Sequence, residues 1–247
     1  MDNNSLKLKT AIETAAVNPV VVMKRYEMKY ILSPDQSDYL LKNLSGHMEV
    51  DSYGKSSIAS LYYDTPTYQL IRTSIEKPAF KEKIRLRSYG LATDDSPVYL
   101  ELKRKAYGIV YKRRVKSTIP DVERFFQGDS DVFAGGQINR EITAFRDFYD
   151  SLSPSCLIIY DRTAFFEPGG SLRLTIDENP RYRIDDLSLK VSMDGKPLLP
   201  QGYSLLEVKV QESIPLWLSS LLDSGKIFKN SFSKYGEAYI QQLLYAQ

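Results

Sequence analysis

Three Glu-x-Lys triplets lie in segments that alternate apolar and charged residues: Glu27-Met28-Lys29, Glu101-Leu102-Lys103 and Glu207-Val208-Lys209. Successive side chains of a β-strand point to opposite faces, so each triplet places a carboxylate beside an ammonium group. Such a pair can simply offset repulsion among neighbouring cations. Alternatively, carboxylates at Glu27, Glu101 and Glu207 could hold Mg²⁺ or Mn²⁺, which bind through one or two carboxylates plus substrate phosphates.

Basic side chains gather on the same face of the other predicted strands. That face holds 14 basic and four acidic residues, a charge of +10 in a chain whose net charge is +2. The basic residues are Arg25, Lys29, Lys81, Lys83, Arg85, Arg87, Lys103, Lys105, Lys112, Arg114, Lys116, Arg162, Arg173 and Lys209, and the acidic residues are Glu27, Glu101, Asp177 and Glu207. A solvated surface would mix lysine with glutamate, because like charges facing one another destabilise a sheet. Arginine forks and lysine charges at this density indicate a phosphate-rich polyanion as ligand.

Strands that carry these residues alternate with short helices. Strands are predicted at residues 21–32, 58–64, 80–89, 98–105, 109–118, 156–166, 172–177 and 205–210, with turns at Asp94–Pro97 and Tyr107–Gly108. Helices are predicted at 33–46, 68–74, 121–126, 138–152, 214–222 and 235–245. Ser33, Pro34 and Gln36 form a helix start with a capping box. We expect a leader segment over residues 1–20 and a single α+β domain over residues 21–247.

Composition excludes several classes of protein. No apolar run approaches the roughly 20 residues of a membrane-spanning helix, and the N-terminus lacks the apolar core of a signal peptide. Cys156 is the single cysteine, which excludes an internal disulfide framework and a cysteine-based zinc site. The single histidine, His47, follows a predicted helix end and is expected at the surface. A cytoplasmic protein fits these features.

Nine blocks in order resemble the VTC domain of polyphosphate polymerases, a branch of the triphosphate tunnel metalloenzymes within the CYTH-like superfamily. The blocks are Arg25–Tyr30, Leu61–Pro66, Lys83–Gly90, Tyr99–Lys105, Tyr111–Arg114, Tyr160–Arg162, Leu172–Asp177, Glu207–Lys209 and Phe232–Gly236. The resemblance implies a closed eight-stranded antiparallel β-barrel, a tunnel with a charged lumen and helices packed outside. It also implies transfer of the γ-phosphoryl group of ATP to a growing polyphosphate chain, assisted by Mn²⁺ or Mg²⁺.

The resemblance also assigns roles to individual residues. The catalytic phosphate-binding set is Lys29, Arg85, Arg87, Lys103, Arg162, Arg173 and Lys209, and the substrate-binding set is Lys112, Arg114, Tyr160, Ser233 and Lys234. Glu207 is the principal metal ligand, with Glu27 and Glu101 as further candidates. Hydrolytic relatives begin with the motif Glu-x-Glu-x-Lys. In this sequence Arg25 takes the place of the first glutamate of that motif. That departure favours the VTC branch. The chain has neither the SPX domain nor the membrane helices of eukaryotic relatives, so a membrane partner stays an open question.

Other functions compete with the polymerase. A tunnel-fold triphosphatase would hydrolyse inorganic or nucleoside triphosphate, with Asp177, Glu101 or Glu27 activating water. A non-catalytic module would bind polyphosphate or inositol phosphates. A nucleic-acid-binding barrel ranks last, because stacking on bases requires aromatics among the basic residues, and many tyrosines are expected on the opposite face. The expected partners are therefore ATP and polyphosphate, pyrophosphate or phosphate, with no nucleic acid; the oligomeric state is left open.

Overall fold

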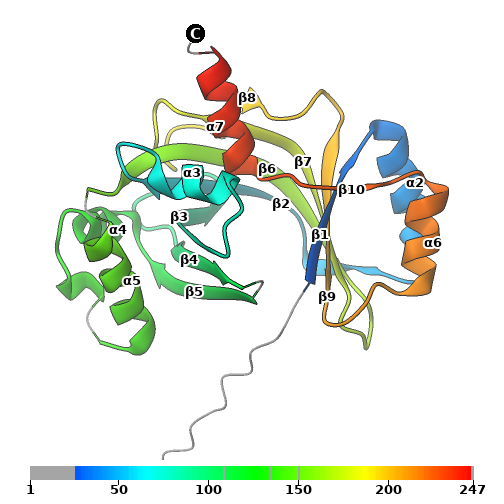
Figure 1. Ribbon diagram of the computed structural model, residues 1–247, viewed down its shortest axis with the longest axis horizontal. Coiled ribbons are helices and arrows are strands. Elements are labelled where there is room, and N and C mark those ends of the chain that lie inside the picture. The colour runs from blue at the N-terminus through cyan, green and yellow to red at the C-terminus, as the bar shows by residue number, and fades with distance from the viewer. Residues whose placement is uncertain (1–25, 108, 134, 150, 246–247) are drawn as a thin grey trace, which may run out of the picture.

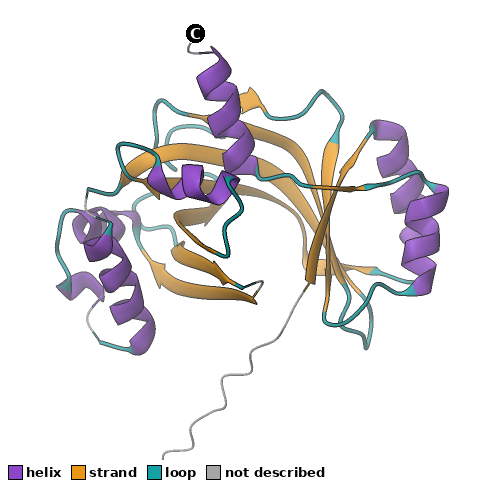
Figure 2. Cartoon of the chain, in the orientation of Figure 1, coloured by secondary structure: helices purple, strands orange, loops and turns teal. Residues whose placement is uncertain are grey.

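A computed structural model describes residues 26–107, 109–133, 135–149 and 151–245. The predicted leader, Arg25 and Gly108 lie outside these residues. The described chain forms a large, curved antiparallel sheet with helices packed against it (Figures 1 and 2). A mixed α+β class, as predicted, is confirmed.

The sheet has ten strands in the order β10-β1-β9-β7-β6-β2-β3-β4-β5, with β8 paired to β7. Eight of them are long: β1 (Tyr26–Leu32), β2 (Glu49–Asp64), β3 (Phe80–Tyr89), β4 (Val98–Ala106), β5 (Ile109–Ser117), β6 (Ser153–Phe166), β7 (Arg173–Arg183) and β9 (Ser204–Val210). The two-residue strands β8 (Lys196–Pro197) and β10 (Lys229–Asn230) were not predicted. All pairs are antiparallel.

The predicted closed barrel is not confirmed, because β5 and β10 stand at the two ends of the sheet. The sheet curves strongly, so that β1 and β5 lie on its two sides (Figure 1). β10 pairs with β1 at Lys29 and Tyr30 and thereby occupies the edge that β5 would need. A side-chain contact spans the opening instead, since Lys103 Nζ on β4 lies 3.2 Å from Glu27 Oε2 on β1.

Six α-helices are present in the described chain: α2 (Pro34–Leu44), α3 (Gln69–Ile75), α4 (Ile119–Phe126), α5 (Gln137–Phe148), α6 (Leu216–Ser224) and α7 (Lys234–Tyr245). The predicted capping box of α2 is confirmed, because Gln36 N donates to Ser33 Oγ and Ser33 N donates to Gln36 Oε1. A 3₁₀ turn at Asp131–Phe133 lies between α4 and α5. None of the described helices combines the length and apolar character that crossing a membrane requires.

Apolar side chains on the convex face of the sheet pack against α2, α4, α5 and α6. Leu100 and Leu102 of β4 are fully buried in one cluster with Phe125 of α4 and Phe145 of α5. Val208 of β9 belongs to a second cluster, under α2 and α6. Burying each such side chain stabilises the fold by roughly 1.5–3 kcal/mol. The apolar residues of these two clusters therefore turn outward, whereas a third cluster on the opposite face of β2 and β6 packs against α3 and α7. The charged residues lie on that opposite, inner face.

Some element boundaries differ from the prediction. β2 begins at Glu49 rather than residue 58, because its polar first half pairs with β6 beyond a register shift between Val50 and Lys55. β7 continues to Arg183, where β8 pairs with it. α5 ends at Phe148 rather than residue 152. Alternation of apolar residues marks only the parts of strands that lie against a helix.

Candidate active site

The concave face of the sheet and the start of α7 enclose a cavity of about 770 Å³. Thirteen of the fifteen predicted site residues line it. They are Lys29, Arg85, Arg87, Lys103, Arg162, Lys209, Lys112, Tyr160, Ser233, Lys234, Glu207, Glu27 and Glu101. Strand alternation brings them together, because each strand residue among them points away from the apolar face of its own strand. Their roles stay predictions, but their common location is a finding.

Two predicted residues do not line this cavity. Arg173, at the start of β7, donates to the carbonyl oxygens of Gly170 and Leu172 at 3.3 and 2.9 Å. Arg114 of β5 donates to Tyr89 Oη at 2.9 Å and lies over the ring of Tyr99, 3.7 Å from its centroid. Arg114 nevertheless contacts the site, because its Nε lies 3.1 Å from Oε1 of Glu101, whereas the partners of Arg173 are local.

Glu101 is enclosed by cations. Its side chain is 1% exposed, and Arg85 Nε donates to Oε2 at 2.9 Å. Lys112 Nζ lies 2.7 Å and Arg114 Nε 3.1 Å from Oε1, and Arg87 Nη1 lies 3.8 Å from Oε2. Burial opposes ionisation, but Arg85, Arg87 and Lys112 together lower the pKa of Glu101 to about 2. The carboxylate is therefore ionised and holds the arginine side chains in place.

Asp177 of β7 is a second buried carboxylate that is held by cations, in this case Arg162 and Lys234. Arg162 Nε and Nη2 donate to its two oxygens at 2.6 and 2.8 Å, and Lys234 Nζ also donates to Oδ2. The carboxylate is fully buried. Burial would raise the pKa of Asp177, but Lys234 and Arg162 lower it to about 2. The start of α7 is thus tied to β6 and β7 through one carboxylate.

Glu207 and Glu27 are less enclosed than Glu101, with side chains 13% and 26% exposed. Lys209 Nζ lies 2.5 Å from Glu207 Oε1, whereas Lys29 Nζ is 3.9 Å from Oε2. The two glutamates lie diagonally across the β1–β9 pair, where Glu27 faces Lys209 and Lys29 faces Glu207. Burial opposes the shift, but Lys209 and Lys29 lower the pKa of Glu207 below its ordinary value.

The donor set around Glu207 fits Mg²⁺ or Mn²⁺ of the kind held by one or two carboxylates together with substrate phosphates. Among the described residues, no three acidic, histidine or cysteine side chains are grouped as a ready-made metal site. Glu101 fits a metal less well, because a further cation would have to enter among the cations that already surround it.

Among the described residues, five tyrosines line the cavity: Tyr26, Tyr62, Tyr107, Tyr160 and Tyr235. Arg87 Nη2 donates to Tyr160 Oη at 3.0 Å, and Lys234 Nζ lies 4.4 Å from the centroid of the Tyr160 ring. Burial would raise the pKa of Tyr160, but Arg162 and Arg87 lower it to about 8. Tyr62 accepts from Arg85 Nη1 at 2.9 Å. Arg85 and Arg87 are therefore oriented by tyrosine hydroxyls in addition to the carboxylate of Glu101.

Of the described residues that line the cavity, seven were not assigned to the site from the sequence, and three of these contact other cavity residues: Tyr62, Lys83 and Tyr235. Lys83 belonged to the charged face of β3, so strand alternation alone was a sufficient signal for it. Tyr62 and Tyr235 lie in the Leu61–Pro66 and Phe232–Gly236 blocks, but nothing in the sequence showed that these blocks meet. In the structure their rings stack with centroids 4.6 Å apart.

The buried carboxylate of Asp64 holds the start of α7 through a hydrogen bond from Tyr235. Tyr235 Oη donates to Asp64 Oδ2 at 2.8 Å, while the backbone N–H groups of Leu70 and Ile71 donate to the same carboxylate at 2.8 and 3.0 Å. Ser233 and Lys234 directly precede Tyr235 and line the cavity. Asp64 thereby links the start of α3 to the segment that supplies site residues.

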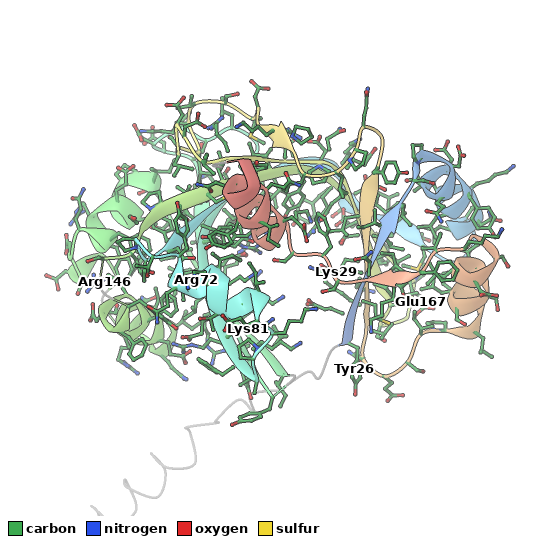
Figure 3. All side chains as sticks on the ribbon, turned by 45° about the horizontal axis from the view of Figure 1, so that its top comes forward. Tyr26, Lys29, Arg72, Lys81, Arg146 and Glu167 are labelled. Atoms are coloured by element: carbon green, nitrogen blue, oxygen red, sulfur yellow. The ribbon has the colours of Figure 1, made fainter. Side chains whose placement is uncertain are left out.

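Figure 3 shows Lys29 on β1 and Lys81 on β3 on the two sides of the space that the sheet encloses, with Arg146 at the left edge of the molecule. His47 is exposed and stacks on Trp217, with ring centroids 4.2 Å apart. Cys156 is buried, which raises the pKa of its thiol. Neither His47 nor Cys156 lines the cavity, so its chemistry depends on cations, carboxylates and tyrosines.

Comparison with known proteins finds a family model, a relative and a solved structure that are similar to this chain. The model of the VTC domain family matches residues 24–243. Vacuolar transporter chaperone complex subunit 4 of Schizosaccharomyces pombe is 27% identical over 211 residues, which covers 68% of this chain and 29% of that protein. This chain therefore spans less than a third of the relative's length.

Among solved structures, a putative adenylate cyclase from Bacillus halodurans is similar to this chain with a TM-score of 0.53 and 15% sequence identity. The similarity covers 85% of this chain and 96% of the other. At that identity it shows a shared fold alone.

Proposed function

The chain belongs to the VTC domain family, and on that premise we propose that it is an ATP-dependent polyphosphate polymerase. It would transfer the γ-phosphoryl group of ATP to a growing polyphosphate chain, or to phosphate or pyrophosphate at the start. One observation carries the proposal: among the described residues, nine cationic and three anionic side chains line a single cavity in a chain whose net charge is +2. A polyanion is the ligand that such a cavity would stabilise.

Phosphoryl transfer depends mainly on positioning and charge neutralisation. Arg85 and Arg87 on β3 and Arg162 on β6 present planar forks that match phosphate oxygens in pairs. Carboxylates and tyrosine hydroxyls hold these forks, so little reorganisation would be needed when a triphosphate binds. The acceptor oxygen of a phosphate is already ionised, which agrees with a cavity whose described lining contains no histidine.

A divalent metal ion, Mn²⁺ or Mg²⁺, would neutralise charge on the transferring phosphates when bound. Glu207 would hold it, with Glu27 as the second carboxylate. Glu101 has a different role in this proposal, that of positioning Arg85 and Arg87. We also propose that residues 21–247 act as one tunnel domain and that it works in the cytoplasm, where ATP is available.

Hydrolysis of a triphosphate is the competing activity. It requires a carboxylate free to activate water, but Asp177 and Glu101 are each bound by two or more cations. Glu27 has a single ion pair of 3.2 Å, to Lys103, and is the best remaining candidate for a base. These contacts favour transfer to phosphate over transfer to water. A purely binding module would use the same cations without turnover.

Incubation of the purified chain with ATP and MnCl₂ tests the proposal, with ADP measured enzymatically and polyphosphate followed by gel. We expect ADP together with long polyphosphate, both lost in Arg162→Met. Arg72→Met, in the exposed part of α3, is the matched control and should leave both products unchanged. Phosphate without polymer would establish the triphosphatase. Polyphosphate binding without any product would establish the binding module.

A further inference from the structure

A second cavity of about 930 Å³ adjoins the first. The described residues that line both cavities, and therefore form the junction between them, are Tyr26, Glu27, Lys29, Lys83, Lys103, Val110 and Ser233. We call the first cavity the inner chamber and the second the outer basin. The junction brings together β1, β3, β4, β5 and the residue before α7.

The two cavities differ in the kind of cation they contain. Arg85, Arg87 and Arg162 line the inner chamber, whereas the described lining of the outer basin has lysines and no arginine. Lysines that belong to the basin alone include Lys77, Lys81, Lys105 and Lys229. Arginine binds a phosphate with fixed, paired geometry, while lysine is a point charge on a flexible stem. Fixed forks suit one triphosphate in one position, and flexible charges suit a chain that has to move.

Strand register gives a second difference. Lys81 lies directly opposite Lys105, and Lys83 directly opposite Lys103, on the β3–β4 pair. The next pair toward the inner chamber is Arg85 with Glu101. Like charges in direct opposition destabilise a sheet. The inner pair is neutralised within the protein, whereas of the four lysines in the two outer pairs only Lys103 has a carboxylate partner among the described residues, Glu27.

Lys83 is the extreme case. Every other lysine or arginine that lines the inner chamber has a carboxylate oxygen within 4.0 Å, but none of the described carboxylates lies that close to Lys83. Its Nζ lies 3.2 Å from Ser233 Oγ. Burial, together with the charges of Lys29 and Lys81, lowers the pKa of Lys83 to about 7.

Acidic groups around the outer basin do not supply the missing charge. Glu82 is bound by Arg104 and by Tyr149 Oη on the convex side of the sheet, and Glu27 is paired with Lys103. Glu237 on α7, whose pKa is raised by burial, forms no ion pair with a described lysine or arginine within 4.0 Å. Glu212 is exposed at the rim. The remaining charges near Lys83 are cationic: Lys29, Lys81, Lys103 and Arg85.

We propose that the outer basin binds the growing polyphosphate chain as acceptor, and that Lys83 binds the phosphate of that chain that lies at the junction. This inference rests on the proposed polymerase function and adds the site of the second substrate. A terminal phosphate oxygen of the chain forms a bond to the γ-phosphorus of ATP held by the arginines. The bond from that phosphorus to the β,γ-bridging oxygen breaks, and ADP leaves with the electron pair. The chain, longer by one phosphate, then slides outward along the lysines.

Steady-state kinetics with ATP and a linear polyphosphate primer of defined length provide the first test. Lys83→Met and the double variant Lys81→Met/Lys105→Met should raise KM for the primer about tenfold, the loss expected for a charge-assisted phosphate contact. KM for ATP should stay unchanged, and Lys42→Met on exposed α2 should change neither constant. An equal rise in both KM values, or an unchanged KM for the primer, would overturn the proposal.

Binding of the same primer, measured by calorimetry without ATP, gives a readout that does not depend on turnover. A bound anion should restore the proton of Lys83, so at about pH 8 the wild type should take up as much as about one proton per primer bound. Lys83→Arg, which is always charged, should bind the primer without that uptake. Equal uptake by the wild type and by Lys83→Arg would refute the role of Lys83. If binding behaves as expected but no polymer forms, the proposed function fails while the acceptor site stands.

Discussion

Arg85 and Glu101 lie directly opposite each other on β3 and β4, and Arg85 Nε donates to Glu101 Oε2 at 2.9 Å. The carboxylate also contacts Lys112 and Arg114 on β5, so one buried glutamate binds cations from two neighbouring strands. It supplies internally part of the negative charge that a triphosphate would bring. The cations can therefore be held close together before a substrate arrives.

Replacing Glu101 by Gln should lower the free energy of unfolding by about 3 kcal/mol, because the buried cations lose their partner. Urea denaturation measures this change. Added tripolyphosphate should recover part of the loss, since it supplies negative charge to the same cations. Glu178→Gln, an exposed glutamate paired with Lys55, is the matched control and should change stability by less than about 0.5 kcal/mol. Equal effects of the two variants would contradict the role given to Glu101.

Acid should destabilise the protein through Asp177. Its pKa of about 2 in the folded state is below the value of about 3.9 expected in the unfolded chain. A depressed pKa contributes stability above the unfolded value, and that contribution is lost as the pH falls toward 2. We expect Asp177 to contribute about 2 kcal/mol near neutral pH. Denaturation curves between about pH 6 and pH 2 should show this loss, with a shallower slope in Asp177→Asn. An identical slope in that variant would assign the acid sensitivity to other groups.

A metal requirement should depend on Glu207 more than on the other carboxylates. Glu207→Gln should raise the Mn²⁺ concentration for half-maximal ADP formation by about 10- to 100-fold. Glu27→Gln should raise it less, and Glu101→Gln should lower activity without altering the Mn²⁺ midpoint, because Glu101 is occupied by arginine and lysine. Titration of each variant with MnCl₂ separates these outcomes. A shifted midpoint in Glu101→Gln alone would move the metal to that residue.

Strand alternation made most of the inner chamber predictable. Lys29, Arg85, Lys103 and Lys209 were placed on one face by residue spacing, and the structure gathers all of them in one cavity. The partners of those residues were not predictable, because they depend on register. The sequence contains Lys81, Lys83, Lys103 and Lys105, but only the pairing of β3 with β4 shows which lysines face each other.

The sequence could not predict whether the barrel closes, for a related reason. β10 is two residues long, and Lys229 and Asn230 show no alternation that would mark a strand. Its pairing with β1 nevertheless decides which edge of the sheet stays open. The enclosure of Glu101 was hidden in the same way, since a Glu-x-Lys triplet looks the same whether its carboxylate binds a metal or an arginine.

Removing the hydroxyl of Tyr235 should loosen the start of α7 without disturbing the packing of its ring. Tyr235→Phe keeps the stacking on Tyr62 but removes the 2.8 Å hydrogen bond to Asp64, a buried carboxylate. We expect a loss of about 1–3 kcal/mol in unfolding free energy, the cost of removing one partner from a buried polar group. Primer binding should also weaken, because Ser233 and Lys234 lie on the same segment. Tyr239→Phe, whose ring lies against Tyr68, is the matched control. Full stability together with weakened binding would show that the Asp64 contact positions α7 without stabilising the fold, whereas no effect on either would show that the hydrogen bond serves neither purpose.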